Sequence, residues 1–343
     1  RASGLIPFSQ IVTSCNSNLL ISLYCPNSWW FFFTFSKACP PMLKQVEDFR
    51  PIFTQKNIEI ITPEVVQVLS EEELLTIIST VDGWIIGDDP ATKKVFEKGK
   101  AGRLKAAVKW GVGVDNVDFE ACKNLGIPIS NTPQMFGGEV ADLAMTYLLG
   151  LARQSYFIDR EVRKGNWVKP SGESISGKTI AVVGLGDIGR STIKRLKGFD
   201  VNIIAYDPFS SLNEVDLGIS SILTFPDKIS QADYIILTCA LTSSSKYMIN
   251  KETINLMKTG VSIINVARGP LINEADLIEA LENNKIKSAA LDVYEIEPLV
   301  SNSKLRNFEQ CIFGTHNGSN TVQAVHRAST KAIEILFEYL NIQ

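Results

Sequence analysis

The chain has 343 residues and a formal net charge of −3 at pH 7, with an ordinary share of apolar residues. This length allows two domains with separate cores, and the near balance of charges gives no indication of a nucleic-acid surface or an acidic tail. The six cysteines show no C-x-x-C spacing, which favours reduced thiols in a cytosolic-type enzyme. Two histidines are too few for a histidine-rich metal centre.

The first part of the chain is unusual because residues 2–36 carry no charge. A membrane span is one interpretation of its apolar and aromatic run, but Pro26 and the polar residues after it leave no stretch of the roughly 20 residues that a bilayer requires. A targeting peptide is another interpretation, and the near absence of basic residues argues against it. We expect residues 30–35 to form a first buried strand and residues 1–28 to be an extension of uncertain order.

Strand and helix patterns alternate from Cys39 onward, which predicts an α/β protein with parallel sheets. Ser70 and Glu73 have the spacing of a capping box and predict the start of a helix. A long helix is expected after Pro133, where apolar residues recur at helical spacing up to Leu151. In this part of the chain we expect strands at residues 58–61, 83–86, 105–108 and 127–130, and a short helix at residues 118–125.

The segment TIAVVGLGDIG at residues 179–189 joins a β-branched strand to the spacing G-x-G-x-x-G. Gly184 permits a tight turn, Gly186 lets the backbone approach a pyrophosphate, and Gly189 lets the following helix pack closely. A second apolar run ends on Asp207, whose carboxylate can accept hydrogen bonds from a ribose and would repel a 2′-phosphate. Together these features predict an NAD site, in preference to a glycine-rich turn without a ligand.

The second half of the chain has the pattern of a complete doubly wound nucleotide domain. Residues 321–339 predict a single helix whose simplest role is to return to the first domain and pack there. We therefore expect an NAD-binding Rossmann domain at residues 133–318, inserted into a substrate domain made of residues 29–132 and 319–343. The six strands of the NAD-binding domain are expected near residues 179–183, 202–206, 233–238, 261–266, 288–293 and 310–314.

Polar side chains that a structural strand would not need follow three of these strands, namely Arg268, Glu297 and His316. The carboxyl ends of parallel strands meet at one edge, so we expect these groups to converge beside the glycine motif. An arginine can hold a carboxylate, a histidine can move the hydroxyl proton, and a carboxylate beside the imidazole raises its pKa. This set predicts hydride transfer to or from a 2-hydroxy acid.

Each of these residues also has a structural explanation when taken alone. Arg268 could lie on a surface loop, Glu297 in a solvated turn, and His316 in the core with its hydrogen bonds satisfied. For His326, inside the final helix, the structural explanation is preferred. The loop with Gly111 and Gly113 also follows a strand, and its amides could meet a substrate carboxylate from the opposite side.

From Cys39 to its end the chain resembles the D-isomer-specific 2-hydroxyacid dehydrogenases, most closely the members similar to D-3-phosphoglycerate dehydrogenase. The order and spacing of the shared motifs make the resemblance specific. The motifs are GVGVDNVD at 111–118, NTP at 131–133, GLGDIG at 184–189, YDP at 206–208, NVARG at 265–269, LDVYE at 291–295 and HNG at 316–318.

The resemblance implies a flavodoxin-like substrate domain, NAD as cofactor, and a homodimer formed through the nucleotide domain, with the helix near residues 139–153 contributing. It implies that Arg268, Glu297 and His316 are catalytic, with Glu297 rather than Glu295 beside the histidine, and that Asp292 holds the nicotinamide carboxamide. The implied substrate contacts are Val112, Gly113, Arg268 and His316. The implied cofactor contacts are Val112, Gly184, Gly186, Asp187, Ile188, Gly189, Asp207, Cys239, Val266, Ala267, Arg268, Asp292, His316, Gly318 and Ser319.

Two acids, Asp88 and Asp89, stand where phosphoglycerate enzymes often carry an arginine for the phosphate. They disfavour a phosphorylated substrate unless a basic residue such as Lys93 or Lys109 compensates. Oxidation of 3-phosphoglycerate therefore competes with reduction of glyoxylate or hydroxypyruvate. No regulatory domain is seen after residue 343, so feedback inhibition by serine is not expected.

The alternative from a different class is an NAD-sensing interaction protein, similar to the C-terminal-binding-protein corepressors that share this fold. Such proteins can retain the same three residues, while long polar tails and a peptide groove would favour that interpretation. We expect a small-molecule substrate, no metal, and neither nucleic acid nor membrane as a partner. We expect a cytoplasmic location, with import into an organelle as the open alternative.

Overall fold

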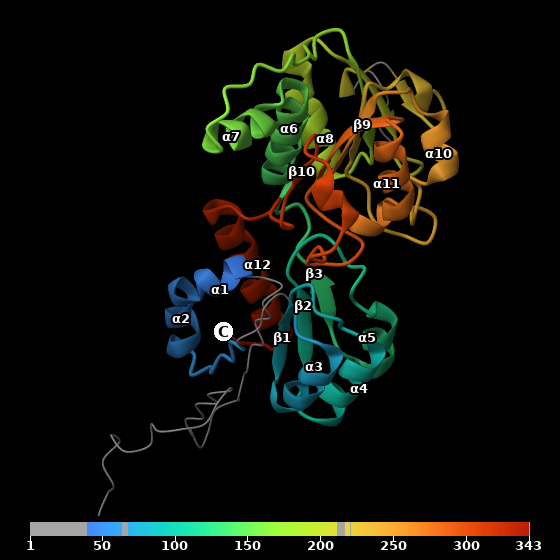
Figure 1. The fold of residues 1–343 in the computed structure, drawn as a ribbon. Helices are drawn as coiled ribbons and strands as arrows, with labels where there is room; N and C mark the ends of the chain where they lie inside the picture. Colours follow the sequence, from blue (N-terminus) through green and yellow to red (C-terminus); the bar gives the residue numbers. More distant parts are fainter. Residues whose placement is uncertain (1–39, 64–67, 211–216, 220, 343) are drawn as a thin grey trace, which may run out of the picture.

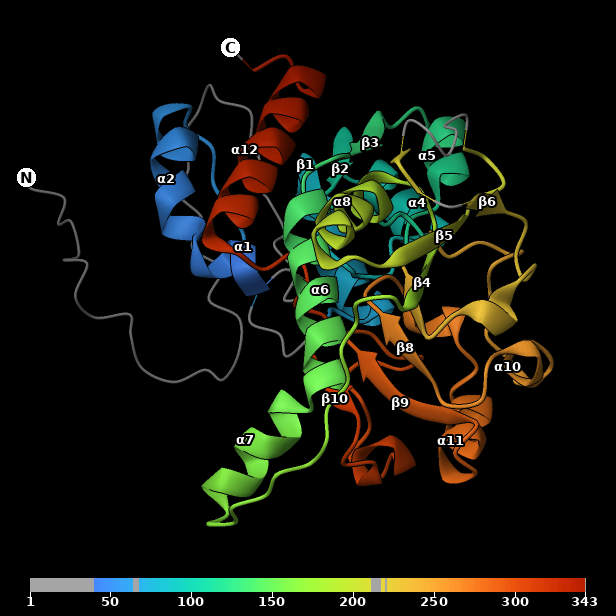
Figure 2. The same cartoon turned by 90° about the horizontal axis from the view of Figure 1, so that it is seen from above.

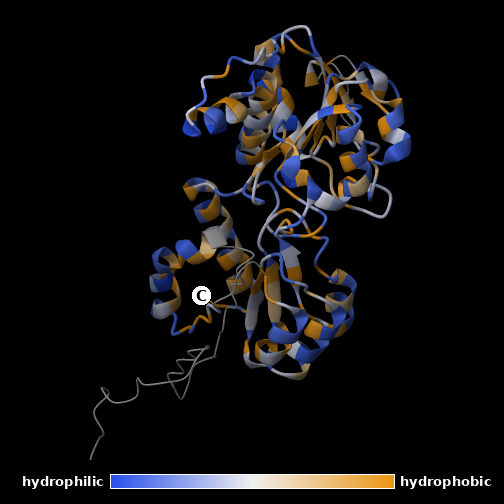
Figure 3. Ribbon diagram, in the orientation of Figure 1, coloured by the Kyte–Doolittle hydropathy of each residue, from blue (hydrophilic) through white to orange (hydrophobic). Residues whose placement is uncertain are grey.

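The computed structural model describes residues 40–342 apart from residues 64–67, 211–216 and 220. The predicted strand at residues 30–35 and the extension at residues 1–28 lie outside the described residues. The described chain forms two lobes, each built around a parallel sheet (Figure 1). Hydrophobic residues concentrate on the strands, whereas the helices carry both hydrophobic and hydrophilic residues (Figure 3). The prediction of an α/β fold with two parallel-sheet domains is confirmed.

The smaller sheet has helices on both faces, as a doubly wound sheet requires. Trp84 and Ile86 pack into a core with the helices on one face, while Ile85 and Val108 pack into another core with the final helix of the chain. Its strands run in the order β1 (Gly83–Ile86), β2 (Ala106–Lys109) and β3 (Ile129–Asn131). Around it lie α1 (Pro40–Lys44), α2 (Val46–Gln55), α3 (Glu71–Ile77), η1 (Ile78–Thr80), α4 (Lys93–Ala101) and α5 (Phe119–Leu125).

Local sequence signals place two helix ends correctly in this lobe. Ser70 and Glu73 form the predicted capping box, in which the Glu73 amide donates to Ser70 Oγ at 3.3 Å and the Ser70 amide donates to Glu73 Oε2 at 2.8 Å. Helix α5 ends at Gly126 with a φ of +63°, a conformation that glycine adopts without strain.

The predicted strand at residues 58–61 is wrong. The Ile58 amide donates to the Phe53 carbonyl at 2.9 Å, which closes the end of α2, and only Ile61 makes a single bridge. A short apolar run can be buried in a loop as well as in a strand, so its pattern could not separate the two.

The larger sheet is parallel throughout and has the strand order β10-β9-β8-β7-β4-β5-β6. The order reverses between β4 and β7, and the carboxyl ends of strands at such a point form the ligand crevice of open α/β sheets. The strands are β4 (Thr179–Val183), β5 (Asn202–Tyr206), β6 (Ser221–Leu223), β7 (Tyr234–Leu237), β8 (Val261–Asn265), β9 (Ile286–Leu291) and β10 (Ile312–Phe313). Six of the seven were predicted, and β6, a half-buried edge strand of three residues, is too short to show a period.

Helices cover this sheet and carry the chain between the lobes. Helix α6 (Gly137–Arg153) packs beside α8 (Asp187–Leu196), and its predicted apolar face, including Tyr147 and Leu148, is buried. Helix α12 (Val322–Tyr339) leaves the larger lobe and packs against β1 and β2 (Figure 1). The other helices that lie wholly within the described residues are α7 (Ser155–Arg163), η2 (Lys197–Phe199), η3 (Ile229–Gln231), α10 (Lys251–Leu256), η4 (Gly269–Leu271), α11 (Glu274–Glu282) and η5 (Lys304–Asn307).

Candidate active site

The glycine turn between β4 and α8 has room for a pyrophosphate. Gly184 has a φ of +101°, and a side chain there would meet the backbone of Cys239. A Cβ at Gly189 would overlap the Gly184 carbonyl oxygen, so this glycine lets α8 pack against the turn. A Cβ at Gly186 would meet no atom within 4 Å, and α8 has no side-chain cap at its N-terminus. The turn therefore offers space and free helix amides to an anion.

Asp207 is held at the end of the strand beside this turn. Its Oδ2 accepts a hydrogen bond from the Leu185 amide at 2.7 Å, and its Oδ1 accepts one from the Phe209 amide at 2.9 Å. Among the described residues no arginine or lysine pairs with it. The carboxylate can still accept hydrogen bonds from ribose hydroxyls, and its charge would repel a 2′-phosphate. The residues present thus fit NAD.

Arg268 follows strand β8, and its guanidinium group is hydrogen-bonded to residues of both lobes. Its Nε donates to Asp115 Oδ1 of the smaller lobe at 2.9 Å, and its Nη1 donates to the Ala267 carbonyl at 2.9 Å. Its Nη2 lies over Gly113, where any Cβ would overlap it. The Asn265 side chain, which is fully buried, fixes the turn by accepting from the Ala267 amide and donating to the Arg268 carbonyl. The guanidinium edge with Nη2 therefore faces the loop between the lobes.

Asp115 forms this contact with Arg268, and the sequence alone assigned no role to it. It lies two positions after Gly113 in the loop that follows β2. An acid next to a glycine loop is a weak signal, because only the fold shows that an arginine from the other lobe reaches it. Burial acts to lower the pKa of Arg268, but the charges of Asp115 and Asp88 outweigh it and the pKa is raised. The arginine therefore stays charged.

His316 and Glu297 form a close pair at the same edge of the sheet. His316 Nδ1 and Glu297 Oε2 are 2.7 Å apart, and Glu297 Oε1 accepts from the Tyr294 amide at 3.0 Å. Glu295 instead accepts from the Glu274 amide, so Glu297 is the acid that contacts the histidine. The pair leaves His316 Nε2 without a partner among the described residues.

Several charges act on the pKa of His316. Burial acts to lower it, but the hydrogen bond and charge of Glu297, together with the charge of Asp88, outweigh burial and the opposing charge of Arg268. The pKa is therefore raised from its ordinary value. A raised pKa keeps the imidazole protonated, and thus able to donate a proton, over a wider range of pH.

Asp292 shapes the loop that carries His316. Its backbone carbonyl accepts from the His316 amide at 2.6 Å, and its carboxylate accepts from the amides of Asn317 at 3.0 Å and Gly318 at 2.8 Å. These bonds support a left-handed φ of +54° at His316. Asp292 is 1% exposed, and its carboxylate contacts the loop directly. Its contact with the nicotinamide carboxamide stays a prediction.

The loop after β2 offers amides from the smaller lobe. The amide of Gly111 donates to Thr132 Oγ1 at 2.7 Å, and Asn131 Nδ2 donates to the Val112 carbonyl at 3.2 Å, so the loop is braced against the end of β3. The amides of Val112 and Gly113 donate to no other residue of the described chain. They are free to meet a carboxylate held by Arg268.

The two acids after β1 differ in their surroundings. Asp89 is fully buried and its Oδ1 accepts from the Leu69 amide at 2.8 Å, so the expectation that both acids face a distal group is wrong for Asp89. Asp88 is 39% exposed and pairs with Lys109 Nζ at 2.9 Å. Lys93 pairs instead with Glu97 along the surface of α4. Of the two lysines considered as compensating charges, Lys109 is the one that reaches the acid.

The remaining residues predicted to contact a cofactor lie at the same edge of the larger sheet. The Asp187 side chain rests against Gly137 of α6, which leaves the first turn of α8 open. Burial raises the pKa of the Cys239 thiol to about 11, so the thiol stays protonated. His326 lies apart from this edge, and its ring packs against that of Phe49 at a tilt of 35°, with the ring centroids 5.1 Å apart. The edge residues are Asp187, Ile188, Cys239, Val266, Ala267, Gly318 and Ser319.

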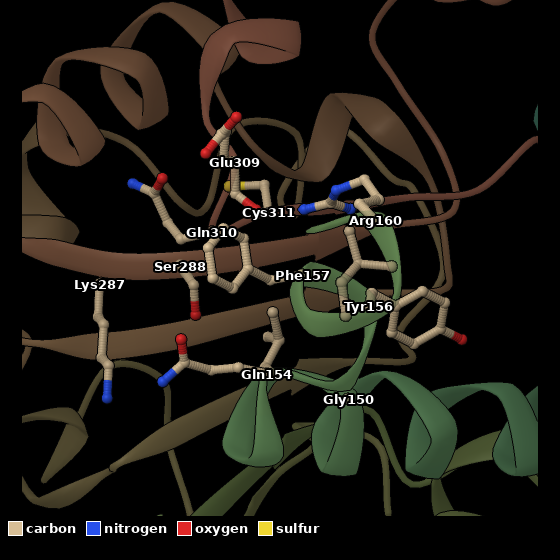
Figure 4. Close-up of a pocket in the computed structure, with 12 residues that line it drawn as sticks. Gly150, Gln154, Tyr156, Phe157, Arg160, Lys287, Ser288, Glu309, Gln310 and Cys311 are labelled. Atoms are coloured by element: carbon tan, nitrogen blue, oxygen red, sulfur yellow. Dashed lines mark hydrogen bonds between the residues drawn. The ribbon is translucent and has the colours of Figure 1, made fainter. Parts of the chain in front are cut away.

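A separate cavity of about 80 Å³ lies where α6 meets α7, beside β9 and β10 (Figure 4). Its lining includes Gln154, Arg160, Lys287 and Glu309, and none of the residues at the glycine turn. It therefore does not belong to the site described above. No helix of the described residues is both long and apolar enough to cross a membrane.

The glycine turn, the hydrogen-bonded pair of His316 and Glu297, and Arg268 all follow strands of the larger sheet at its carboxyl edge, an arrangement typical of nicotinamide-dependent dehydrogenases. Residues 145–318 match the family model described as D-isomer specific 2-hydroxyacid dehydrogenase, NAD binding domain. The hydroxypyruvate reductase of Thermotoga maritima is 35% identical over 279 residues, which cover 80% of this chain and 90% of that protein. The apo-structure of D-lactate dehydrogenase from Escherichia coli has a TM-score of 0.78 at 27% identity, covering 91% of this chain and 97% of that one.

The chain thus belongs to the D-isomer specific 2-hydroxyacid dehydrogenase family and is an NAD-dependent oxidoreductase. The D-3-phosphoglycerate dehydrogenase of Methanocaldococcus jannaschii is 38% identical over 275 residues, 79% of this chain, and the match spans only 52% of that protein. The relatives named here are reductases and dehydrogenases, so the corepressor interpretation is not favoured.

Proposed function

We propose that the chain interconverts a small D-2-hydroxy acid and its 2-keto acid by hydride transfer with NAD(H). The observation that carries this proposal is the pair of His316 and Glu297, 2.7 Å apart, at the same sheet edge as Arg268. An isolated dinucleotide site would need neither an oriented imidazole nor an arginine held from the opposite lobe.

In this proposal the protein residues bind and protonate the keto acid. Arg268, through Nη2, and the free amides of Val112 and Gly113 hold the substrate carboxylate. NADH, which the glycine turn and Asp207 would hold, would supply the hydride. His316 Nε2 gives its proton to the carbonyl oxygen at the same time, and takes it back in the oxidation direction. Glu297 keeps the imidazole oriented and stabilises its protonated form.

We infer the domain assignment from the course of the chain. Residues 29–132 with residues 319–343 would form the substrate domain, and residues 133–318 the NAD-binding domain. The packing of α12 against β1 and β2 supports this division. Helix α7 projects from the larger lobe, and Trp167, after it, is 82% exposed, which supports a homodimer through this side of the molecule (Figure 2).

Reduction of a panel of 2-keto acids tests the proposal. The purified chain is incubated with NADH and glyoxylate, hydroxypyruvate or 3-phosphohydroxypyruvate. NADH consumption is measured for all three acids, and the configuration of the product for the last two, since glycolate is achiral. We expect turnover of at least one acid, any chiral product in the D configuration, and unphosphorylated acids reduced at least as well as the phosphorylated one. Tight NADH binding without turnover of any 2-keto acid would contradict the proposal and restore the interaction-protein alternative.

A further inference from the structure

Asp88 is fixed at the carboxyl edge of the smaller sheet, the edge from which the loop after β2 reaches Arg268 of the larger lobe. It comes two residues after β1, and the backbone on both sides of it is tied down. Asn116 Nδ2 donates to the carbonyl of Gly87 at 3.0 Å and to the carbonyl of Asp89 at 2.7 Å. The position of Asp88 is therefore set by the loop that follows β2.

The same loop reaches the arginine of the other lobe. Asn116 directly follows Asp115, whose carboxylate accepts from Arg268 Nε at 2.9 Å. The segment that holds Asp88 in place is thus the segment that contacts the proposed carboxylate-binding group. A substrate held by Arg268 would have the Asp88 side of the crevice next to it.

Lys109 determines which part of Asp88 is available to a ligand. Its side chain is 2% exposed, and its Nζ donates to the Gly87 carbonyl at 2.5 Å and to Asp88 Oδ1 at 2.9 Å. Asp88 Oδ2 has no hydrogen-bond partner among the described residues, and the Asp88 side chain is 39% exposed. A ligand in the crevice can therefore reach an acceptor oxygen of Asp88 but cannot reach the lysine directly.

The charges of the crevice support this placement. Burial acts to raise the pKa of Asp88, but the positive charges of Lys109, His316 and Arg268 outweigh it and lower the pKa to about 2. Asp88 is thus an ionised carboxylate at neutral pH. It lies close enough to Arg268 and His316, which we propose to act on the substrate, for their charges to act on it.

We propose that Asp88, held by the buried Lys109, selects 2-keto acids whose third carbon carries a neutral hydrogen-bond donor, namely a hydroxyl. This inference rests on the proposed function. The hydroxyl donates to Asp88 Oδ2, the only strong acceptor of this pair that remains free.

Other substituents fit the pair less well. A phosphate would bring negative charge against Asp88, while Lys109 is too deeply buried to receive it. An ammonium would face the positive charges of Arg268 and protonated His316. A methyl group would leave the carboxylate oxygen without its hydrogen bond, and a site built to hydrogen-bond a hydroxyl discriminates strongly against the analogue that lacks it.

The test compares kcat/KM for four acids with NADH as cofactor. Glyoxylate has no third carbon and is the internal reference, while pyruvate, hydroxypyruvate and 3-phosphohydroxypyruvate carry hydrogen, hydroxyl and phosphate there. In the wild type we expect hydroxypyruvate to exceed pyruvate by about tenfold or more, the factor expected for a hydrogen bond to a charged group. We expect 3-phosphohydroxypyruvate to be a poorer substrate than hydroxypyruvate.

Two variants separate the hydrogen bond from the charge. Asp88→Ala should bring the ratio of hydroxypyruvate to pyruvate to within about threefold of unity, because the acceptor is gone. Asp88→Asn should retain part of that ratio, because its amide oxygen still accepts, while raising the rate with 3-phosphohydroxypyruvate relative to glyoxylate. Normalising to glyoxylate removes any effect of Asp88 on His316 that is common to all substrates. Lys93→Ala is the matched control and should change none of the ratios, since Lys93 pairs with Glu97 on α4.

The outcomes distinguish this inference from the proposed function. Turnover with unchanged substrate ratios in both Asp88 variants, while NADH binding shows them to be folded, would overturn the role of Asp88 and leave the dehydrogenase assignment intact. A wild-type preference for 3-phosphohydroxypyruvate would also overturn it. If the wild type reduces none of the four acids, the proposed function fails and the inference falls with it.

Discussion

The two lobes contribute different groups to the site at which they meet. The larger lobe contributes Arg268 and His316, with the carboxylate of Glu297 beside the histidine, and each is held by hydrogen bonds near a strand end. The smaller lobe contributes carboxylates, Asp88 and Asp115, and amides without partners. We infer that the larger lobe carries the reaction, while the smaller lobe aligns the arginine and selects the substrate. Mutations in the two lobes should therefore change different kinetic quantities.

The largest effect should come from the proton-transfer group of the larger lobe. His316→Ala should lower kcat by about 10²–10⁴-fold while leaving NADH binding largely intact, because a general acid–base residue acts on the reaction rather than on cofactor binding. Steady-state kinetics and NADH fluorescence titration measure the two quantities. His326→Ala, in α12, is the matched control and should behave as the wild type. Near wild-type turnover of the His316 variant would refute the assignment.

Arg268→Lys should lower kcat/KM for the keto acid by about a hundredfold, since an ammonium cannot replace the planar fork that holds a carboxylate. The same substitution at Arg50, an exposed residue of α2 that pairs with Glu47, should have no effect. A loss shared equally by both variants would show that the change acts on stability rather than on substrate binding.

The cofactor side of the larger lobe can be tested through Asp207. The wild type should prefer NADH to NADPH, and Asp207→Ala should reduce that preference by about tenfold, because the like charge facing a 2′-phosphate is removed. The preference is measured as the ratio of kcat/KM for the two cofactors. Wild-type turnover with NADPH as good as with NADH would contradict the role given to this carboxylate.

The smallest effect is expected from the smaller lobe's contact with the arginine. Asp115→Asn should raise KM for the keto acid by about fivefold with little change in kcat or in NADH binding, because the pair aligns Arg268 and lies partly exposed to solvent. Asp115→Glu, which restores the charge, should recover part of the loss. An unchanged KM in Asp115→Asn would show that the contact with Asp115 does not align Arg268 for substrate binding.

Features set by local sequence could be predicted, and features set by the packing of distant segments could not. The glycine turn at Gly184, the capping box at Ser70 and the pairing of His316 with Glu297 follow from short motifs or from the resemblance to known dehydrogenases. The contact of Arg268 with Asp115 joins residues 153 positions apart in different lobes, and no local pattern reports it. The burial of Asp89 beside Leu69, with Asp88 left exposed, likewise depends on the turn after β1 rather than on residue type.

The pH dependence of keto-acid reduction tests the central claim most directly. In the proposed mechanism, reduction needs protonated His316, whose pKa is raised above its ordinary value by Glu297 and Asp88 against the effect of burial. We therefore expect kcat/KM to be constant at low pH and to fall as pH rises through that raised pKa. Glu297→Gln should move the fall to lower pH, because the stabilising charge is lost while the side chain keeps its shape. A profile with the same midpoint in both proteins would contradict the proton transfer by His316 and Glu297.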